Sequence, residues 1–178
     1  MKSIILFFAF FSVFASNAAH IVGGDIYYDY LGGNNYRFYI TLYRDCFSTG
    51  AQYDNPLPLA VYTSGNFLLT SIDVPFPGSV ILPVVFNNPC GTAPTDICVE
   101  KAIYTTVINL PPAVGGYTVS YQRCCRGPAV TNLIGPDNTG ITLSTHVPGS
   151  ETGFTINSSP RFTNYPPLVL CSNDQLIF

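Results

Sequence analysis

The sequence predicts an all-β protein, an immunoglobulin-like β-sandwich stapled by disulfides. Short segments of alternating apolar and polar residues recur along the chain, separated by turns rich in Gly, Pro and Asn. After residue 18, no window keeps apolar residues at helical spacing for three turns. All six cysteines follow an N-terminal apolar segment, and an even count in an exported chain indicates disulfides.

Residues 1–18 are predicted to be a secretory signal peptide. A basic start is followed by an apolar run from Ile4 to Phe14 and then by small residues. That run is shorter than the roughly 20 residues that a transmembrane helix needs. We therefore expect a secreted or outer cell-surface protein with no transmembrane segment after cleavage.

Residues 19–158 form the predicted β-sandwich domain, and residues 159–178 either begin a further β-domain or form a C-terminal strand. Eight strand segments at regular spacing support the sandwich. Turn residues separate them, such as those of 31–35 and 64–66. The expected strands are 21–30, 36–45, 57–63, 67–74, 79–85, 99–110, 117–125 and 141–147.

The stretch from Pro111 to Arg126 is the most informative part of the chain. Two prolines and a Gly-Gly turn lead into a strand that closes on Cys124 and Cys125. Adjacent strand residues point to opposite faces, so we expect these two cysteines to have different, distant partners. Every second residue of this strand follows the same pattern as in the strand that ends at Cys46. In both, three apolar residues are followed by an Arg and then by a Cys.

These observations yield one expected set of disulfides, although six cysteines allow many others. Two cysteines at the C-terminal ends of antiparallel neighbours would lie about 25 Å apart, too far for a bond. A Cys46–Cys125 bond therefore requires two strands that run the same way and face each other across the sandwich, as strands B and F do. The expected pairs are Cys46–Cys125, Cys124–Cys171 and, bracketing a loop, Cys90–Cys98.

Composition and motifs argue against several classes of function. The net charge of −3, without a basic cluster, excludes a nucleic-acid partner. The cysteine spacing does not fit a zinc site, and the turn 137–140 lacks the acidic ligands of a calcium loop, so no metal or cofactor is expected.

No catalytic residue is predicted, so we expect that the protein is not an enzyme. Ile21-Val22-Gly23-Gly24 matches the start of activated trypsin-like proteases, but no Gly-x-Ser-x-Gly nucleophile motif occurs. We interpret this segment as the entry to a strand with a glycine bulge. The ten acidic residues are scattered, so no pair is favoured for glycoside hydrolysis.

Arg44 and Arg123 are predicted to be structural. Each lies on an apolar strand face next to a cysteine, and a buried arginine must be paired. Asp25, Asp45 and backbone carbonyls are the candidate partners. A set of tyrosines could either be buried between the sheets or be exposed to stack on sugars, and it comprises Tyr27, Tyr28, Tyr30, Tyr39, Tyr43 and Tyr104.

Several segments, in this order, resemble the N-terminal region of gliding-motility-associated, PKD-repeat adhesin-like surface proteins of Bacteroidetes. The resemblance covers essentially the whole chain after the signal peptide, and its most specific block is Tyr121-Gln122-Arg123-Cys124-Cys125-Arg126. The other segments are Ala19–Gly24, Tyr43–Cys46, Val74–Gly78, Cys98–Glu100, Gly115–Tyr117 and Ser159–Cys171.

The resemblance implies a non-enzymatic structural or adhesive module that forms part of a larger type IX secretion cargo. Such proteins continue into further β-domains and a sorting domain, so further domains are expected after Phe178. The implied partner is an unidentified surface ligand, either a protein or a polysaccharide. The alternative function is a secreted carbohydrate-binding β-sandwich module.

Overall fold

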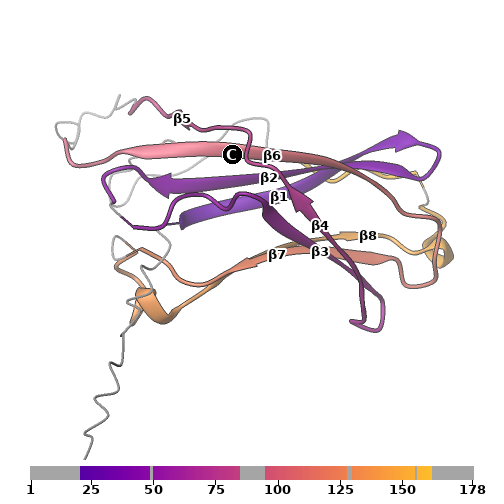
Figure 1. The fold of residues 1–178 in the computed structure, drawn as a ribbon. Coiled ribbons are helices and arrows are strands. Elements are labelled where there is room, and N and C mark those ends of the chain that lie inside the picture. The colour runs from indigo at the N-terminus through magenta and orange to yellow at the C-terminus, as the bar shows by residue number, and fades with distance from the viewer. Residues whose placement is uncertain (1–20, 49, 85–94, 128–129, 155, 162–178) are drawn as a thin grey trace, which may run out of the picture.

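Two four-stranded antiparallel sheets make up the structure (Figure 1), a computed structural model that describes residues 21–48, 50–84, 95–127, 130–154 and 156–161. One sheet has the order β1-β2-β6-β5 and the other has the order β4-β3-β7-β8. The strands are β1 (Ile21–Gly32), β2 (Asn35–Asp45), β3 (Leu57–Thr63), β4 (Leu68–Val74), β5 (Val80–Ile81), β6 (Val99–Asn109), β7 (Tyr117–Arg123) and β8 (Ile141–Val147).

Helical structure in the described residues is limited to two single turns of 3-10 helix, η1 (Pro136–Asn138) and η2 (Ser150–Thr152). The first overlaps the turn expected at residues 137–140. No helix in the described part of the chain is long and apolar enough to cross a membrane.

The core lies between the two sheets, which confirms the predicted β-sandwich architecture at the level of its layers. Every second side chain of β2 is buried, with Phe38, Ile40 and Leu42 fully enclosed. From the other sheet, β7 contributes Val119 and Tyr121 to the same cluster. The two-residue period read from the sequence is therefore the period of burial on both central strands.

Turn residues define the strand boundaries where they were predicted. Gly33 and Asn34 have φ of 58° and 64°, and Asn66 in the β3–β4 turn has φ of 59°. Gly and Asn adopt this left-handed conformation most readily, so each hairpin closes there. In the expected strand 79–85, β5 spans only Val80–Ile81, and residue 85 lies outside the described part.

The ends of β2 and β7 meet at the first residue of β1. Ile21 pairs with Arg44 of β2 and forms a parallel bridge with Arg126, just after β7. Because both strands reach this point at their C-terminal ends, they run the same way in opposite sheets. That placement confirms the orientation inferred from their shared sequence phase.

The structure overturns the predicted pairing of Cys46. Cys46 is bonded to Cys98, with Cα atoms 5.3 Å apart, so the predicted pairs Cys46–Cys125 and Cys90–Cys98 are wrong. The prediction considered only the distance between two cysteines that both follow the C-terminal ends of strands. Cys98 lies just before β6, and the antiparallel register aligns Asp45 with Val99. The C-terminal end of β2 therefore lies beside the N-terminal start of β6.

The adjacent cysteines were also predicted wrongly. Cys124 is bonded to Cys125, which excludes the predicted pair Cys124–Cys171. The prediction assumed that strand alternation continues through both cysteines, but β7 ends at Arg123. Cys90 and Cys171 lie outside the described residues.

The last described segment lies along the outer edge of β1. Ser159 donates its backbone N–H to the Tyr28 carbonyl over 2.9 Å, and its hydroxyl accepts the Tyr28 N–H over 3.0 Å. The Ser158 hydroxyl accepts the N–H of Tyr30 over 3.1 Å. Residues 157–161 therefore cover this edge, whereas the predicted signal peptide and residues 162–178 lie outside the described part.

We expect the Cys46–Cys98 bond to be the main covalent contribution to stability. It joins residues 52 apart, and closing a loop of that size stabilises by about 4 kcal/mol through the entropy of the unfolded chain. In denaturant titrations without reductant, Cys46→Ala/Cys98→Ala should lose about that free energy of unfolding. Cys124→Ser/Cys125→Ser, which opens no long loop, should lose less than about 1 kcal/mol. Equal losses would contradict this assignment.

Candidate functional site

Arg44 and Arg123 lie at one end of the sandwich. Both of them contact the loop that connects β2 to β3. We call residues 46–56 the arginine-anchored loop. Arg44 is the penultimate residue of β2, and Arg123 is the last residue of β7 in the opposite sheet. The shared phase of the two strands brings their arginines to the same end.

The Arg44 guanidinium is almost completely buried, with 4% of its side chain exposed. Its Nη1 donates to Glu100 Oε1 over 2.5 Å. Its Nε donates to the Ala51 carbonyl over 3.3 Å, and its Nη2 donates to the Ser48 carbonyl over 3.0 Å. One cation thus fixes the conformation of the arginine-anchored loop through its backbone.

Glu100, at the start of β6, links this cation to two further segments. Ser79 Oγ donates to the second carboxylate oxygen of Glu100 over 2.7 Å. The Tyr53 hydroxyl, from the arginine-anchored loop, donates to the Glu100 carbonyl over 2.9 Å. Both oxygens of the carboxylate therefore have donors within the protein.

Arg123 makes the corresponding contacts from the opposite sheet. Its Nη1 lies 3.2 Å from Asp54 Oδ1, an ion pair without hydrogen-bond alignment, and its Nη2 donates to the Gln52 carbonyl over 2.7 Å. The Tyr121 hydroxyl donates to Asp54 Oδ2 over 2.6 Å. The Tyr104 hydroxyl donates to the Asp54 carbonyl over 2.6 Å.

Burial is the largest cause that raises the pKa of the three tyrosines that contact this loop, Tyr53, Tyr104 and Tyr121. The hydrogen bond to the Asp54 carboxylate raises the pKa of Tyr121 further. These hydroxyls are hydrogen-bond donors fixed in their protonated form. They serve to hold the loop rather than to exchange protons near neutral pH.

The predicted structural role of the two arginines fits this geometry, and the backbone carbonyls predicted as partners are present. The carboxylate partners are Glu100 and Asp54, not the predicted Asp45 and Asp25. Asp25 Oδ1 is buried without a hydrogen-bond partner. Sequence reasoning missed Glu100 and Asp54 because they reach the arginines only through the folded sheets.

The protease-like segment of the sequence lies at the start of β1. Ile21 of the protease-like segment is a fully buried residue of β1, with Val22 as the extra residue of a bulge. This confirms the strand entry, whereas the predicted glycine bulge is wrong, because Gly23 and Gly24 are both paired with β2. Among the described residues, no three His, Cys, Asp or Glu side chains gather to hold a metal.

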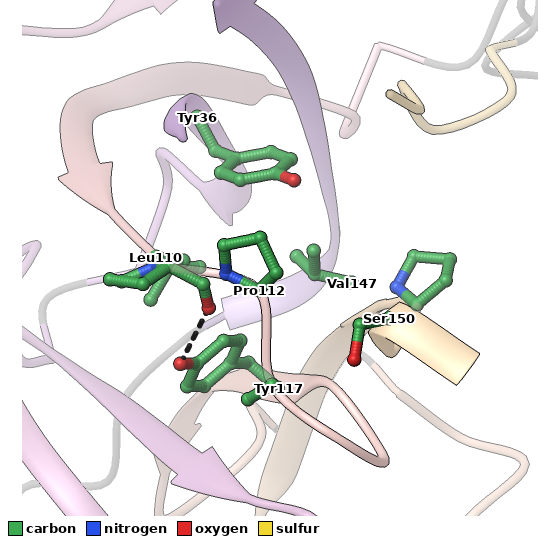
Figure 2. A pocket seen from close by; sticks show the side chains of 9 residues that line it. Tyr36, Leu110, Pro112, Tyr117, Val147 and Ser150 are labelled. Atoms are coloured by element: carbon green, nitrogen blue, oxygen red, sulfur yellow. Dashed lines mark hydrogen bonds between the residues drawn. The ribbon is translucent and has the colours of Figure 1, made fainter. Parts of the chain in front are cut away.

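A small hollow lies beside the turn between β6 and β7 (Figure 2). Tyr36, Leu110, Pro112, Tyr117, Val147 and Ser150 are among the residues that line it. The Tyr117 hydroxyl donates to the Pro111 carbonyl over 2.8 Å at its rim. With a volume of about 10 Å³, the hollow accommodates about one water molecule.

Of the six tyrosines that could be either buried or exposed, two are buried and four are half-buried. Tyr28 and Tyr104 are buried in the core. Tyr27 and Tyr39 stack on each other with ring centroids 4.8 Å apart. The Arg161 guanidinium covers this pair, 4.9 Å from the Tyr27 ring centroid.

An exposed apolar segment lies at the start of β4, an edge strand; the short edge strand β5 of the other sheet is exposed as well, at Val80 and Ile81. Phe67 and Leu68 are 76% and 59% exposed, and Leu69 is 53% exposed. Leu68 pairs with Tyr62 and Thr70 pairs with Val61, so Leu69 is the extra residue of a bulge. The turn that leads into β4 protrudes from the two layers (Figure 1). We call residues 67–73 the open edge.

No described strand pairs with the outer side of β4, which ends its sheet. Natural proteins blunt such edges with Lys, Pro, a β-bulge or a covering segment, and of these devices β4 has the bulge at Leu69. Within the open edge, the single charge is Asp73, and neither Lys nor Pro occurs. Three consecutive large apolar residues were the sequence signal, because an alternating strand cannot bury all three.

No protein-family model matches the chain, and no curated protein or solved structure is significantly similar to it.

We expect Arg44→Ala to lower the free energy of unfolding by about 3 to 5 kcal/mol, because it leaves Glu100 without its buried partner. Arg37→Ala is the matched control, since Arg37 is exposed on the same strand, and its effect should stay within about 0.5 kcal/mol. Denaturant titration measures both. A small effect at Arg44 would contradict its anchoring role.

We also expect stability to fall at alkaline pH. Because burial raises the pKa of Tyr53, Tyr104 and Tyr121 in the folded state, the stability linked to their protons is intact below about pH 10. It is lost as the pH rises and the unfolded chain ionises. Absorbance at 295 nm, followed with circular dichroism, should show these three among the 12 tyrosines ionising only on unfolding. Full ionisation of the folded protein would contradict this.

Proposed function

We propose that this chain is a non-enzymatic structural or adhesive module of a secreted or cell-surface protein, which binds its partner through the open edge. The observation that carries the proposal is the exposed apolar edge strand β4 on a frame that is otherwise fixed by disulfides and ion pairs. Contiguous exposed apolar residues on a folded domain typically mark an interaction site.

The partner at the open edge is proposed to be an extended segment of another protein. The outer side of an edge strand presents a row of backbone N–H and C=O groups. Another extended backbone satisfies that row by adding a strand, and apolar side chains of the added strand would cover Leu68 and Leu69. A polysaccharide offers no such regular pattern of amide groups.

The finer fold proposed for this module is immunoglobulin-like. Strand orders β1-β2-β6-β5 and β4-β3-β7-β8 match the A-B-E-D and C′-C-F-G orders of that fold. The match puts β2 and β7 in the places of strands B and F, the positions expected from their sequence phase. In that fold the C′ strand is an edge of its sheet, and here it is β4.

The proposed context is the N-terminal part of a gliding-motility-associated adhesin exported from a Bacteroidetes cell. The sequence resemblance supports this context, with its most specific block at the end of β7. The Cys46–Cys98 disulfide supports it independently, because such bonds persist in oxidising compartments outside the cytosol.

The test compares adhesion of the producing cells with wild-type protein and with Leu68→Lys/Leu69→Lys. Charges on the open edge disfavour strand addition and burial of the surface, so adhesion should fall at least several-fold while surface amount and melting temperature stay unchanged. Val107→Lys is the control, since Val107 is also half exposed but lies on β6 in the other sheet. Unchanged adhesion in the double variant, or equal loss in the control, would overturn the proposal.

A further inference from the structure

The Cys124–Cys125 disulfide differs from Cys46–Cys98 in what it holds together. Cys46–Cys98 joins residues 52 apart and clips the end of β2 to the start of β6. Cys124–Cys125 joins neighbours, so it closes no loop of the chain. Disulfide stabilisation grows with the length of the closed loop, so stability offers no account of this bond.

Opening the bond would leave its surroundings held by other contacts. Seven residues of β7 are paired with β8, and four of them are also paired with β3. After the cysteines, the Arg126 N–H lies 2.9 Å from both the Pro136 and the Thr139 carbonyls. The bond can therefore break and re-form without unfolding either sheet.

The setting of the pair also favours chemical attack. Cys124 is exposed and Cys125 is half buried, so an external reagent reaches the Cys124 sulfur first. Arg123 and Arg126 flank the pair in the sequence. Arg123 is engaged by Asp54, whereas Arg126 Nε is buried without a hydrogen-bond partner. Adjacent cationic groups favour the thiolate form of a cysteine, which makes it a better leaving group.

We infer that Cys124–Cys125 is a thiol-exchange site, at which an external thiol forms a mixed disulfide with Cys124. The attacking thiolate bonds to Cys124 Sγ, the Cys124–Cys125 bond breaks, and its electron pair leaves on Cys125 Sγ, which takes a proton from solvent. A second thiolate then displaces Cys124 and forms a disulfide with the first. The pair gains two electrons and two protons, and two external thiols become one disulfide.

The test exposes the oxidised full chain to increasing reduced glutathione, traps free thiols by alkylation, and maps the peptides by mass spectrometry. We expect Cys124 to carry glutathione, or both cysteines of the pair to be alkylated, at glutathione concentrations at least ten-fold below those that open Cys46–Cys98. Circular dichroism should remain that of the folded protein. Reduction of the two disulfides together, or only on unfolding, would overturn the inference.

Single variants separate the roles of the two sulfurs. Cys125→Ser leaves the exposed Cys124 thiol, which should react with glutathione disulfide at least ten-fold faster than the Cys125 thiol left by Cys124→Ser. Arg126→Gln should slow opening of the wild-type pair several-fold, whereas Arg37→Gln, at a distant exposed position, should not. The assignment would be overturned if the two single-cysteine variants reacted at equal rates and Arg126→Gln opened at the same rate as Arg37→Gln. Folding of each variant is checked by its melting temperature.

Discussion

Burial of the Arg44 guanidinium is the constraint that organises one whole end of this sandwich. A cation that is almost entirely out of water must be paired and hydrogen-bonded, and here Glu100 supplies the charge while loop carbonyls supply the remaining acceptors. The cation therefore holds the β2–β3 connection at the carbonyls of Ser48 and Ala51. Arg123 repeats the arrangement from the opposite sheet, so the loop that crosses between the sheets is tied to both of them.

This rigid end contrasts with the sheet edge at β4, whereas the edge at β1 is covered. The edge at β1 is covered by the chain itself, through Ser158 and Ser159, and Arg161 pairs with Asp29 beside it. The edge at β4 carries exposed Leu68 and Leu69 and has no covering segment among the described residues. A fixed frame with an open strand such as β4 can present a preformed backbone pattern to a partner, and little ordering entropy is lost on binding.

Much of the fold follows from local sequence rules, because strand alternation and turn chemistry act over a few residues. Phe38, Ile40 and Leu42 are buried as their period predicts, and the hairpins turn at Asn34 and Asn66. The errors concern residues distant in sequence. Glu100 and Cys98 become neighbours of Arg44 and Cys46 only through the β2–β6 register, which no local pattern encodes. Asp54 likewise reaches Arg123 only when the two sheets stack. Three consecutive apolar residues in the sequence indicate the open edge, but its position at the end of a sheet depends on the topology of the fold.

The contact between Ser159 and Tyr28 has a mechanical consequence. Ile21 begins β1, and Ser158 and Ser159 are hydrogen-bonded to the same strand, so tension applied between these two points first loads this short contact. While the hydrogen bonds of this contact remain intact, they bear the applied force and the core does not. When its few hydrogen bonds break, the chain lengthens slightly and the load passes to the β1–β2 ladder, so a chain pulled at these two points yields in steps.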